Sequence, residues 1–215
     1  MNYRFSTGTS NNLSLASQLT RRFRNGFQVN IAYTRVFYRN DENPGTGGYA
    51  GTMNNAFSLS QEWGRASDAQ RNTLRATTIV RLPYQFSLAA TYIMGSGQWY
   101  QSVYAQNPVG FQGTRLIPKP GAVFGLINGY DGSLVPRNDF EGKPIHKVDM
   151  RLTKDFTLGR MKVTGIAEVF NVFNHANYGA YNLTINAANY GTPVQPFLST
   201  TYIPRSGQLA FKLSF

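Results

Sequence analysis

The chain contains no cysteine among its 215 residues. Disulfide bonds are therefore excluded, and with them the small secreted domains that depend on them. Charged residues make up only 14% of the chain, whereas soluble domains usually carry about a quarter. No stretch approaches the roughly 18 apolar residues of a membrane-spanning helix. These absences leave open a membrane β-barrel, because alternating strands give only a weak hydropathy signal.

Motifs of common enzyme sites are also missing. The sequence has no phosphate-binding loop, no dinucleotide-binding glycine pattern, no paired-histidine zinc motif and no nucleophile elbow. His146 and His175 are the only histidines; one precedes a predicted strand and the other begins a predicted loop, so they do not predict a shared metal site. We therefore expect no enzymatic activity, no catalytic residue, no metal and no cofactor.

The last eleven residues, 205–215, alternate between apolar and polar side chains. Leu209, Phe211, Leu213 and Phe215 fall on one face of a strand, and the residues between them fall on the other. A strand of about ten residues that is apolar on one face and ends in an aromatic residue is typical of an outer-membrane β-barrel. Six further segments alternate in the same way: 11–22, 27–37, 72–82, 86–94, 145–156 and 160–173.

The connections between these segments alternate in length. Short turns are predicted at 23–26, 83–85 and 157–160, and Asn25-Gly26 is a strong hairpin-turn signal. The three other connections are long, Gly-rich or Pro-rich loops, which are uncommon inside compact domains. In an up-and-down barrel every second connection lies on the same rim, so short periplasmic turns and long extracellular loops are expected.

Aromatic residues lie near the predicted strand ends, as expected of interfacial girdles. Those near the short turns are Phe23, Phe27, Tyr84, Phe86, Phe156 and Phe215, and those expected at the loop end are Tyr33, Phe37, Tyr92, Trp99, Phe173 and Tyr202. In the second long loop, Trp99, Tyr100, Tyr104 and Phe111 could stack on a sugar or siderophore ring, or pack the loop on itself.

Charged residues on the polar strand faces predict a ladder of ion pairs that lines a barrel lumen. They are Asp149, Arg151, Asp155, Lys162, Glu168 and Lys212. A pair of carboxylates like that of a glycosidase is the alternative interpretation of these acids.

The net charge of +11 is the usual sign of a nucleic-acid-binding protein. Here the basic residues are scattered singly, apart from Arg21, Arg22 and Arg24, and no nucleic-acid-binding motif accompanies them. We therefore expect no nucleic-acid partner. On a barrel this charge would suit contact with lipopolysaccharide phosphates or with an anionic solute.

Four segments carry a resemblance to a known family: 19–34, 81–97, 165–179 and the terminal S-G-Q-L-A-F-K-L-S-F. The third is the most specific and contains Glu168-Val-Phe-Asn171-Val-Phe-Asn174-His175. Over nearly its whole length the chain resembles the C-terminal barrel of TonB-dependent outer-membrane receptors. It looks closest to the subgroup with Oar-like barrels and carboxypeptidase-regulatory-like N-terminal domains.

The resemblance implies active uptake of a scarce solute, such as a siderophore or an oligosaccharide, across the outer membrane of a Gram-negative bacterium. It implies lipid and lipopolysaccharide as surroundings, and the TonB complex as energy source through an N-terminal plug. The terminal strand with Leu209, Phe211, Leu213 and Phe215 resembles the signal read by the barrel-assembly machinery.

The resemblance also implies a barrel of about 22 strands, whereas seven are predicted here. Single-chain bacterial barrels have even strand numbers. No plug, energy-coupling box or signal peptide is visible, and no apolar segment follows Met1-Asn2-Tyr3-Arg4. We therefore expect an all-β fold, an antiparallel meander of seven or eight strands, with residues 1–215 forming the C-terminal segment of a larger barrel.

Two alternatives remain open. A small closed barrel or adhesin without transport would need an eighth strand at 2–9, which contains Tyr3 and Phe5. A soluble carbohydrate-binding sandwich would require the face with Leu209, Phe211 and Leu213 to meet the face with Val29, Ile31 and Tyr33 across a core.

Overall fold

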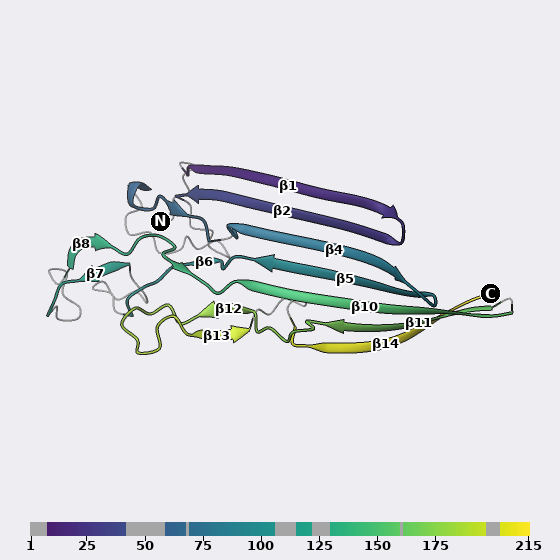
Figure 1. The fold of residues 1–215 in the computed structure, drawn as a ribbon. Helices are drawn as coiled ribbons and strands as arrows, with labels where there is room; N and C mark the ends of the chain where they lie inside the picture. Colours follow the sequence, from purple (N-terminus) through teal and green to yellow (C-terminus); the bar gives the residue numbers. More distant parts are fainter. Residues whose placement is uncertain are drawn as a thin grey trace, which may run out of the picture.

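The computed structural model describes residues 8–41, 59–67, 69–105, 115–121, 130–159, 161–196 and 203–215 (Figure 1). Within these residues no helix has the length and apolar character needed to span a membrane.

Seven long strands form one open antiparallel sheet, in the order β1-β2-β4-β5-β10-β11-β14. Their bounds are β1 (Ser10–Arg24), β2 (Phe27–Asn40), β4 (Asn72–Leu82), β5 (Phe86–Gly95), β10 (Ile145–Leu158), β11 (Met161–Phe170) and β14 (Ser206–Ser214). Figure 1 shows them side by side, with β1 and β14 at opposite edges and no pairing between those edges. The predicted meander of seven strands is confirmed.

Three tight turns join consecutive strands at one end of the sheet, which we call the turn end. Asn25 and Gly26 take φ values of 55° and 76°, as a two-residue hairpin turn requires. Tyr84 and Gln85 also have positive φ, at 59° and 63°, and the Phe86 N–H donates to the Pro83 carbonyl oxygen at 3.3 Å. Gly159 follows β10 with a φ of 61°. All three turns lie where the sequence predicts them.

The strand registers place the apolar residues of all seven strands on one face. Leu19 pairs with Ile31 and Ile31 with Ala76, while on the last strands Ala167 pairs with Leu209. Directly paired residues point to the same face of a sheet, so these pairs extend one apolar surface across the whole sheet. The apolar face is exposed: Leu209 and Phe211 are 85% and 76% accessible.

This arrangement excludes the two-layer sandwich for the described residues. Val29 pairs with Thr78, and the register continues through β4, β5, β10 and β11 to place Phe211 on the same face as Val29. The two apolar faces that a sandwich would bring together are therefore parts of one surface of one sheet.

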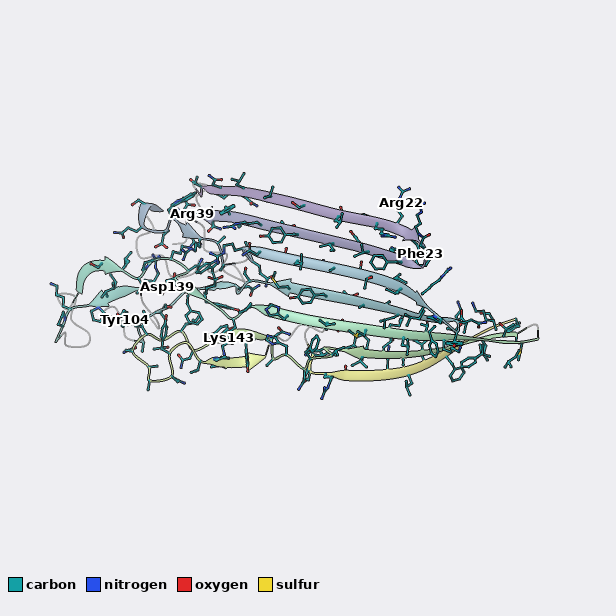
Figure 2. All side chains as sticks on the ribbon, viewed as in Figure 1. Arg22, Phe23, Arg39, Tyr104, Asp139 and Lys143 are labelled. Carbon is teal, nitrogen blue, oxygen red and sulfur yellow. The ribbon has the colours of Figure 1, made fainter. Side chains whose placement is uncertain are left out.

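Short elements form the opposite end, which we call the loop end. They are η1 (Leu59–Gln61), β3 (Gly64–Arg65), β6 (Trp99–Tyr100), β7 (Leu116–Pro118), β8 (Tyr130–Leu134), β9 (Phe140–Glu141), β12 (Tyr178–Tyr181) and β13 (Pro193–Pro196). β3 pairs with β2, β6 with β9, β7 with β8 and β12 with β13. Figure 2 shows Arg22 and Phe23 at the turn end, and Arg39, Tyr104, Asp139 and Lys143 at the loop end.

Two predicted strand ends are wrong by three residues. The strand predicted to end at Phe37 continues to Asn40 as β2. The strand predicted to run to Phe173 ends at Phe170, because Asn171 adopts a φ of 50° and leaves the ladder. The Asn171 side chain instead donates to the carbonyl oxygens of His175 and Ile203, at 3.0 and 3.1 Å, and so ties the start of the third long loop to its end.

Candidate functional site

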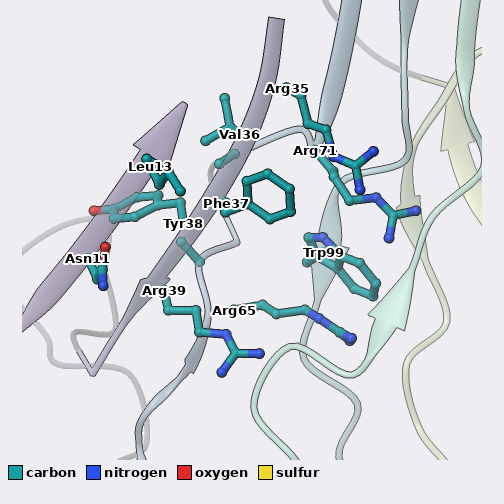
Figure 3. A pocket seen from close by; sticks show the side chains of 12 residues that line it. Asn11, Leu13, Arg35, Val36, Phe37, Tyr38, Arg39, Arg65, Arg71 and Trp99 are labelled. Carbon is teal, nitrogen blue, oxygen red and sulfur yellow. The ribbon is translucent and has the colours of Figure 1, made fainter. Parts of the chain in front are cut away.

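A groove of about 380 Å³ lies at the loop end, between β1–β2 and the short elements (Figure 3). Its lining holds four arginines and no acidic residue; the twelve lining residues are Asn11, Leu13, Arg35, Val36, Phe37, Tyr38, Arg39, Arg65, Ala66, Ala69, Arg71 and Trp99. We refer to it as the arginine groove.

Strand β2 contributes the first two arginines by simple alternation. Arg35, Phe37 and Arg39 are two residues apart, so all three point to the apolar face of the sheet. Their direct partners on β1 are Leu15, Leu13 and Asn11. The Arg35 guanidinium lies 4.9 Å from the centre of the Phe37 ring. On this face of β2 the side chains are thus apolar near the turn end and mostly basic near the loop end.

Strand β3 and the segment before β4 contribute the other two arginines. Arg65 pairs directly with Arg39 across β2 and β3, which places two like charges opposite one another. The Arg65 guanidinium lies 4.0 Å above the centre of the Trp99 ring, and that of Arg71 lies 5.9 Å from it. Trp99 is only 9% accessible, so its ring forms a fixed floor on which Arg65 rests, as Figure 3 shows.

Little negative charge balances these arginines within the described residues. Arg71 contacts Glu141 at 3.4 Å, and both side chains are partly exposed. Ion pairs of this kind contribute roughly 0–1 kcal/mol. None of the ion pairs found in the described part of the chain includes Arg35, Arg39 or Arg65. The groove therefore presents a concentrated positive charge beside an apolar surface.

A buried ion pair holds the short elements beneath this groove in place. The Arg115 guanidinium donates to the Glu62 carboxylate at 2.5 Å, and the two side chains are 5% and 4% accessible. Arg137 donates from Nη1 to the carbonyl oxygens of Asn40 and Glu62, each at 2.8 Å. These contacts join β2, the segment after η1 and the segments around β7 and β8, and so fix the position of β3.

An aromatic cluster fills the centre of the loop end. Tyr181 contacts Tyr100 and Phe140, with ring centres 5.3 and 5.2 Å apart, and Phe140 contacts Tyr190 at 5.8 Å. The Tyr100 hydroxyl donates to the Gly179 carbonyl oxygen at 3.0 Å. Burial raises the pKa of Tyr100, and the nearby Tyr181 adds to this rise. Burial also raises the pKa of Tyr181, against the opposing effect of the Lys143 N–H that donates to it.

The predicted substrate-contact aromatics have different surroundings. Trp99 lies in the arginine groove, and Tyr100 packs in the aromatic cluster. Tyr104 is partly exposed beside the bridge that joins Val103 to Thr184. Phe111 lies outside the described residues, as does Tyr202. Among the described aromatics, the packing role is visible for Trp99 and Tyr100, and contact with a substrate stays a prediction.

The polar face of the sheet carries a ladder of ion pairs. These are Lys147–Asp149 at 2.7 Å, Arg151–Glu168 at 2.5 Å and Lys162–Asp155 at 2.9 Å. Gln208 of β14 also donates to Glu168, and Thr164 donates to Asp155 at 2.6 Å. Lys212 lies on the same face, opposite Thr164. The acids predicted from the sequence thus each have a cation beside them on this face.

The predicted girdle residues lie near the turn end. Phe23, Tyr84 and Phe156 are exposed, whereas Phe27 and Phe86 are partly covered. Basic side chains sit on several of these rings: Arg21 is 5.2 Å from Phe27, and Arg81 is 4.6 Å from Phe23. On the last strand Leu209, Phe211, Leu213 and Phe215 are all exposed. A role for these residues in barrel assembly stays a prediction.

The two histidines lie closer together than their sequence positions indicate. Their ring centres are 5.3 Å apart, edge to face, and the Tyr92 hydroxyl is 2.9 Å from Nδ1 of His146. The described residues contain no group of three His, Cys, Asp or Glu side chains that could hold a metal ion.

Sequence reasoning missed the arginine groove because its members come from four separate segments. The one local signal is Arg35-Val-Phe-Tyr-Arg39, in which two arginines occupy apolar-face positions of a strand. Arg65, Arg71 and Trp99 belong to segments without any period, so their contact with that strand could not be predicted.

Comparison with known proteins gives a family but no individual relative. No curated protein and no solved structure matches the chain. Residues 91–208, more than half of the chain, match the family described as outer membrane beta barrel domain. This match agrees with the open antiparallel sheet, its exposed apolar face and its separate turn and loop ends. The chain belongs to the outer membrane beta barrel domain family, and membership indicates a protein of the outer membrane.

Proposed function

We propose that the chain forms part of the wall, and the extracellular loops, of a TonB-dependent receptor that takes up a scarce solute across the outer membrane. The observation that carries this proposal is the asymmetry of the sheet. Three tight turns occupy one end, while the other end holds eight short elements, an aromatic cluster and a charged groove. A receptor needs such a folded surface on the side where its solute arrives.

The unpaired edges support a barrel larger than the described sheet. β1 and β14 have no partner on their outer sides within the described residues. Both strands run from the loop end to the turn end, so direct pairing between them would be parallel. An antiparallel barrel needs an odd number of additional strands between them. Many such strands would complete a receptor barrel.

A small closed barrel is the second candidate, because a single additional strand also satisfies this requirement. The segment 2–9, proposed as that strand, lies almost entirely outside the described residues. The family match is equally compatible with both candidates.

The two candidates differ in the distance between the edges. Seven strands are separated by six spacings of about 4.8 Å, so the edges of a wide arc are roughly 30 Å apart. One bridging strand would bring them to about 10 Å. Because the chain has no cysteine, Ser17→Cys on β1 and Ser206→Cys on β14 can carry spin labels. Strong dipolar broadening of the spectrum in the outer membrane would show that the two labels are close together, and would establish the small barrel.

Transport is tested by growth on limiting solutes. A strain that lacks the gene is compared with its parent under limitation of iron, cobalamin or oligosaccharide, in the presence and absence of the TonB protein. We expect deletion of the gene to lower growth on one solute class when TonB is present, and to have no effect on that growth when TonB is absent. Growth equal to that of the parent on every solute, or a deletion effect that persists when TonB is absent, would contradict the proposal.

A further inference from the structure

We propose that the arginine groove binds a phosphate group of a phosphorylated glycolipid in the outer leaflet, whose acyl chains lie on the apolar face of β1 and β2. The inference rests on the proposed orientation, in which the loop end faces outward. It goes beyond solute uptake, because it assigns a lipid site on the outside of the barrel wall.

The position of the groove selects a lipid rather than a solute in the lumen. Arg35, Phe37 and Arg39 lie on the apolar face, opposite to the face that carries the ladder of ion pairs. Leu13 of β1 lines the groove and is directly paired with Phe37. Both side chains are exposed, and Leu15 and Leu19 continue the same apolar surface toward the turn end. A ligand in this groove therefore meets charge at one end and an apolar wall at the other.

The charge distribution selects an anion. Arg39 and Arg65 occupy directly paired positions, where side chains of like charge destabilise a sheet. An anion that lies between the two guanidinium groups would relieve this repulsion, and the relief adds to its free energy of binding. Guanidinium groups bind phosphate oxygens through paired, charge-assisted hydrogen bonds.

Two of the guanidinium groups are held ready for such a ligand. Arg65 is stacked 4.0 Å above the ring of the buried Trp99, and Arg35 lies 4.9 Å from the Phe37 ring. A long side chain that is already stacked on a ring loses less conformational entropy when a ligand binds. Arg71 can exchange its exposed partner Glu141 for a phosphate at little cost.

Binding can be followed through Trp99. The chain has two tryptophans, Trp63 and Trp99, so Trp63→Phe leaves a single fluorophore in the groove. The full chain, purified from outer membranes in detergent, is titrated with a bis-phosphorylated lipid A glycolipid. The comparison ligands are the same lipid without phosphates, the acyl-free phosphorylated sugar and inorganic phosphate.

We expect the phosphorylated lipid to bind more tightly than all three comparison ligands. Arg39→Gln and Arg65→Gln should each weaken binding by about tenfold, as loss of one charge-assisted contact predicts. Arg22→Gln, at the turn end, is the matched control and should leave the affinity unchanged. Equal binding of the lipid without phosphates, or equal affinity in the Arg39 and Arg65 variants, would overturn the proposal.

Two further outcomes separate this proposal from others. If the acyl-free sugar or inorganic phosphate binds as tightly as the lipid, the groove is a site for a soluble anion, and the lipid assignment is wrong. If lipid binding behaves as expected while deletion of the gene leaves growth on every solute intact, the lipid site stands and the transport proposal fails.

Discussion

Lys154 and Phe86 are directly paired on β10 and β5, and the Lys154 ammonium lies 4.5 Å from the centre of the Phe86 ring. The same ammonium is 5.6 Å from the Phe156 ring and donates to the Tyr84 carbonyl oxygen. Lys154 thus places a charge on the apolar face, as Arg35 and Arg39 do, but directs it to the turn end. A side chain that extends toward the headgroup region in this way avoids the hydrocarbon.

Replacing Lys154 by Gln should destabilise the folded sheet by about 1 kcal/mol, because the cation–ring contacts are lost. The measurement is urea unfolding of the chain in phospholipid vesicles. Lys212→Gln is the matched control, since Lys212 lies on the polar face of β14, and it should shift stability by less than about 0.5 kcal/mol. Equal effects of the two substitutions would show that the ring contacts of Lys154 add nothing.

Arg115→Gln should open the loop end without unfolding the long strands. It breaks the buried ion pair with Glu62, and breaking a buried pair by removal of one member costs about 3–5 kcal/mol. Amide hydrogen exchange should show at least a hundredfold loss of protection at Gly64 and Arg65, and little change in the middle of β10 and β11. Arg71→Gln, which breaks the exposed pair with Glu141, should have a small effect at the same amides.

The aromatic cluster should loosen at high pH. Tyr100 donates its hydroxyl proton to the Gly179 carbonyl oxygen, and its pKa is raised by burial. A raised pKa in the folded state means that the stabilisation is complete below the ordinary value of about 10. It is lost as the pH rises through the folded-state pKa.

Tyrosinate absorbance between pH 9 and pH 12 measures this effect. In the wild type, part of the tyrosinate absorbance should develop at a higher pH than that of the exposed tyrosines. This part should be smaller in Tyr100→Phe. Tyr84→Phe is a suitable control, because Tyr84 is exposed at the turn end. A late component of the same size in Tyr100→Phe would mean that Tyr100 titrates with the exposed tyrosines.

The proposed orientation predicts which ends of the sheet can be labelled on intact cells. Ala105→Cys lies at the loop end, next to Tyr104 and hydrogen-bonded through its backbone N–H to Asn186 of the third long loop. Arg22→Cys lies at the turn end, and each is the single thiol of its variant. A membrane-impermeant maleimide should label Ala105→Cys on whole cells, and Arg22→Cys only after the outer membrane is permeabilised. The reverse pattern would invert the orientation and remove the basis for a lipid site in the outer leaflet.

The terminal strand can be tested as an assembly signal. Phe215→Ala removes an exposed aromatic residue from the apolar face of β14, and should lower the amount of chain in the outer membrane severalfold. Ser214→Ala changes the adjacent polar position and should leave that amount unchanged. Fractionation with quantitative blotting measures both, and equal amounts in the two variants would argue against the signal.

The long strands could be predicted because each face repeats with a period of two and the turns carry local signals. Asn72–Leu82 agrees at both ends, and Asn25-Gly26 fixes the first hairpin without any tertiary information. The early end of β11 was missed because Asn171 leaves the ladder to hold two distant carbonyl groups. Contacts of that range have no local sequence pattern.

The loop end could not be predicted for the same physical reason. Glu62 and Arg115 are 53 positions apart, and Arg65 meets Trp99 from a different loop. Neither contact repeats with a strand or helix period. Composition did indicate a positive surface, but only the folded loops show that four of its arginines gather in one groove.

The alternation of tight turns and long loops has a consequence for the order of folding. The pairs β1–β2, β4–β5 and β10–β11 each close across a few residues, whereas β5 and β10 are joined by the 49 positions between Gly95 and Ile145. Closing a longer loop costs more chain entropy, so hairpins are expected to form before they dock on one another. The arginine groove needs β2, β3 and Trp99 together, so it becomes complete only after the hairpins have docked, and its ligand can bind only the assembled wall.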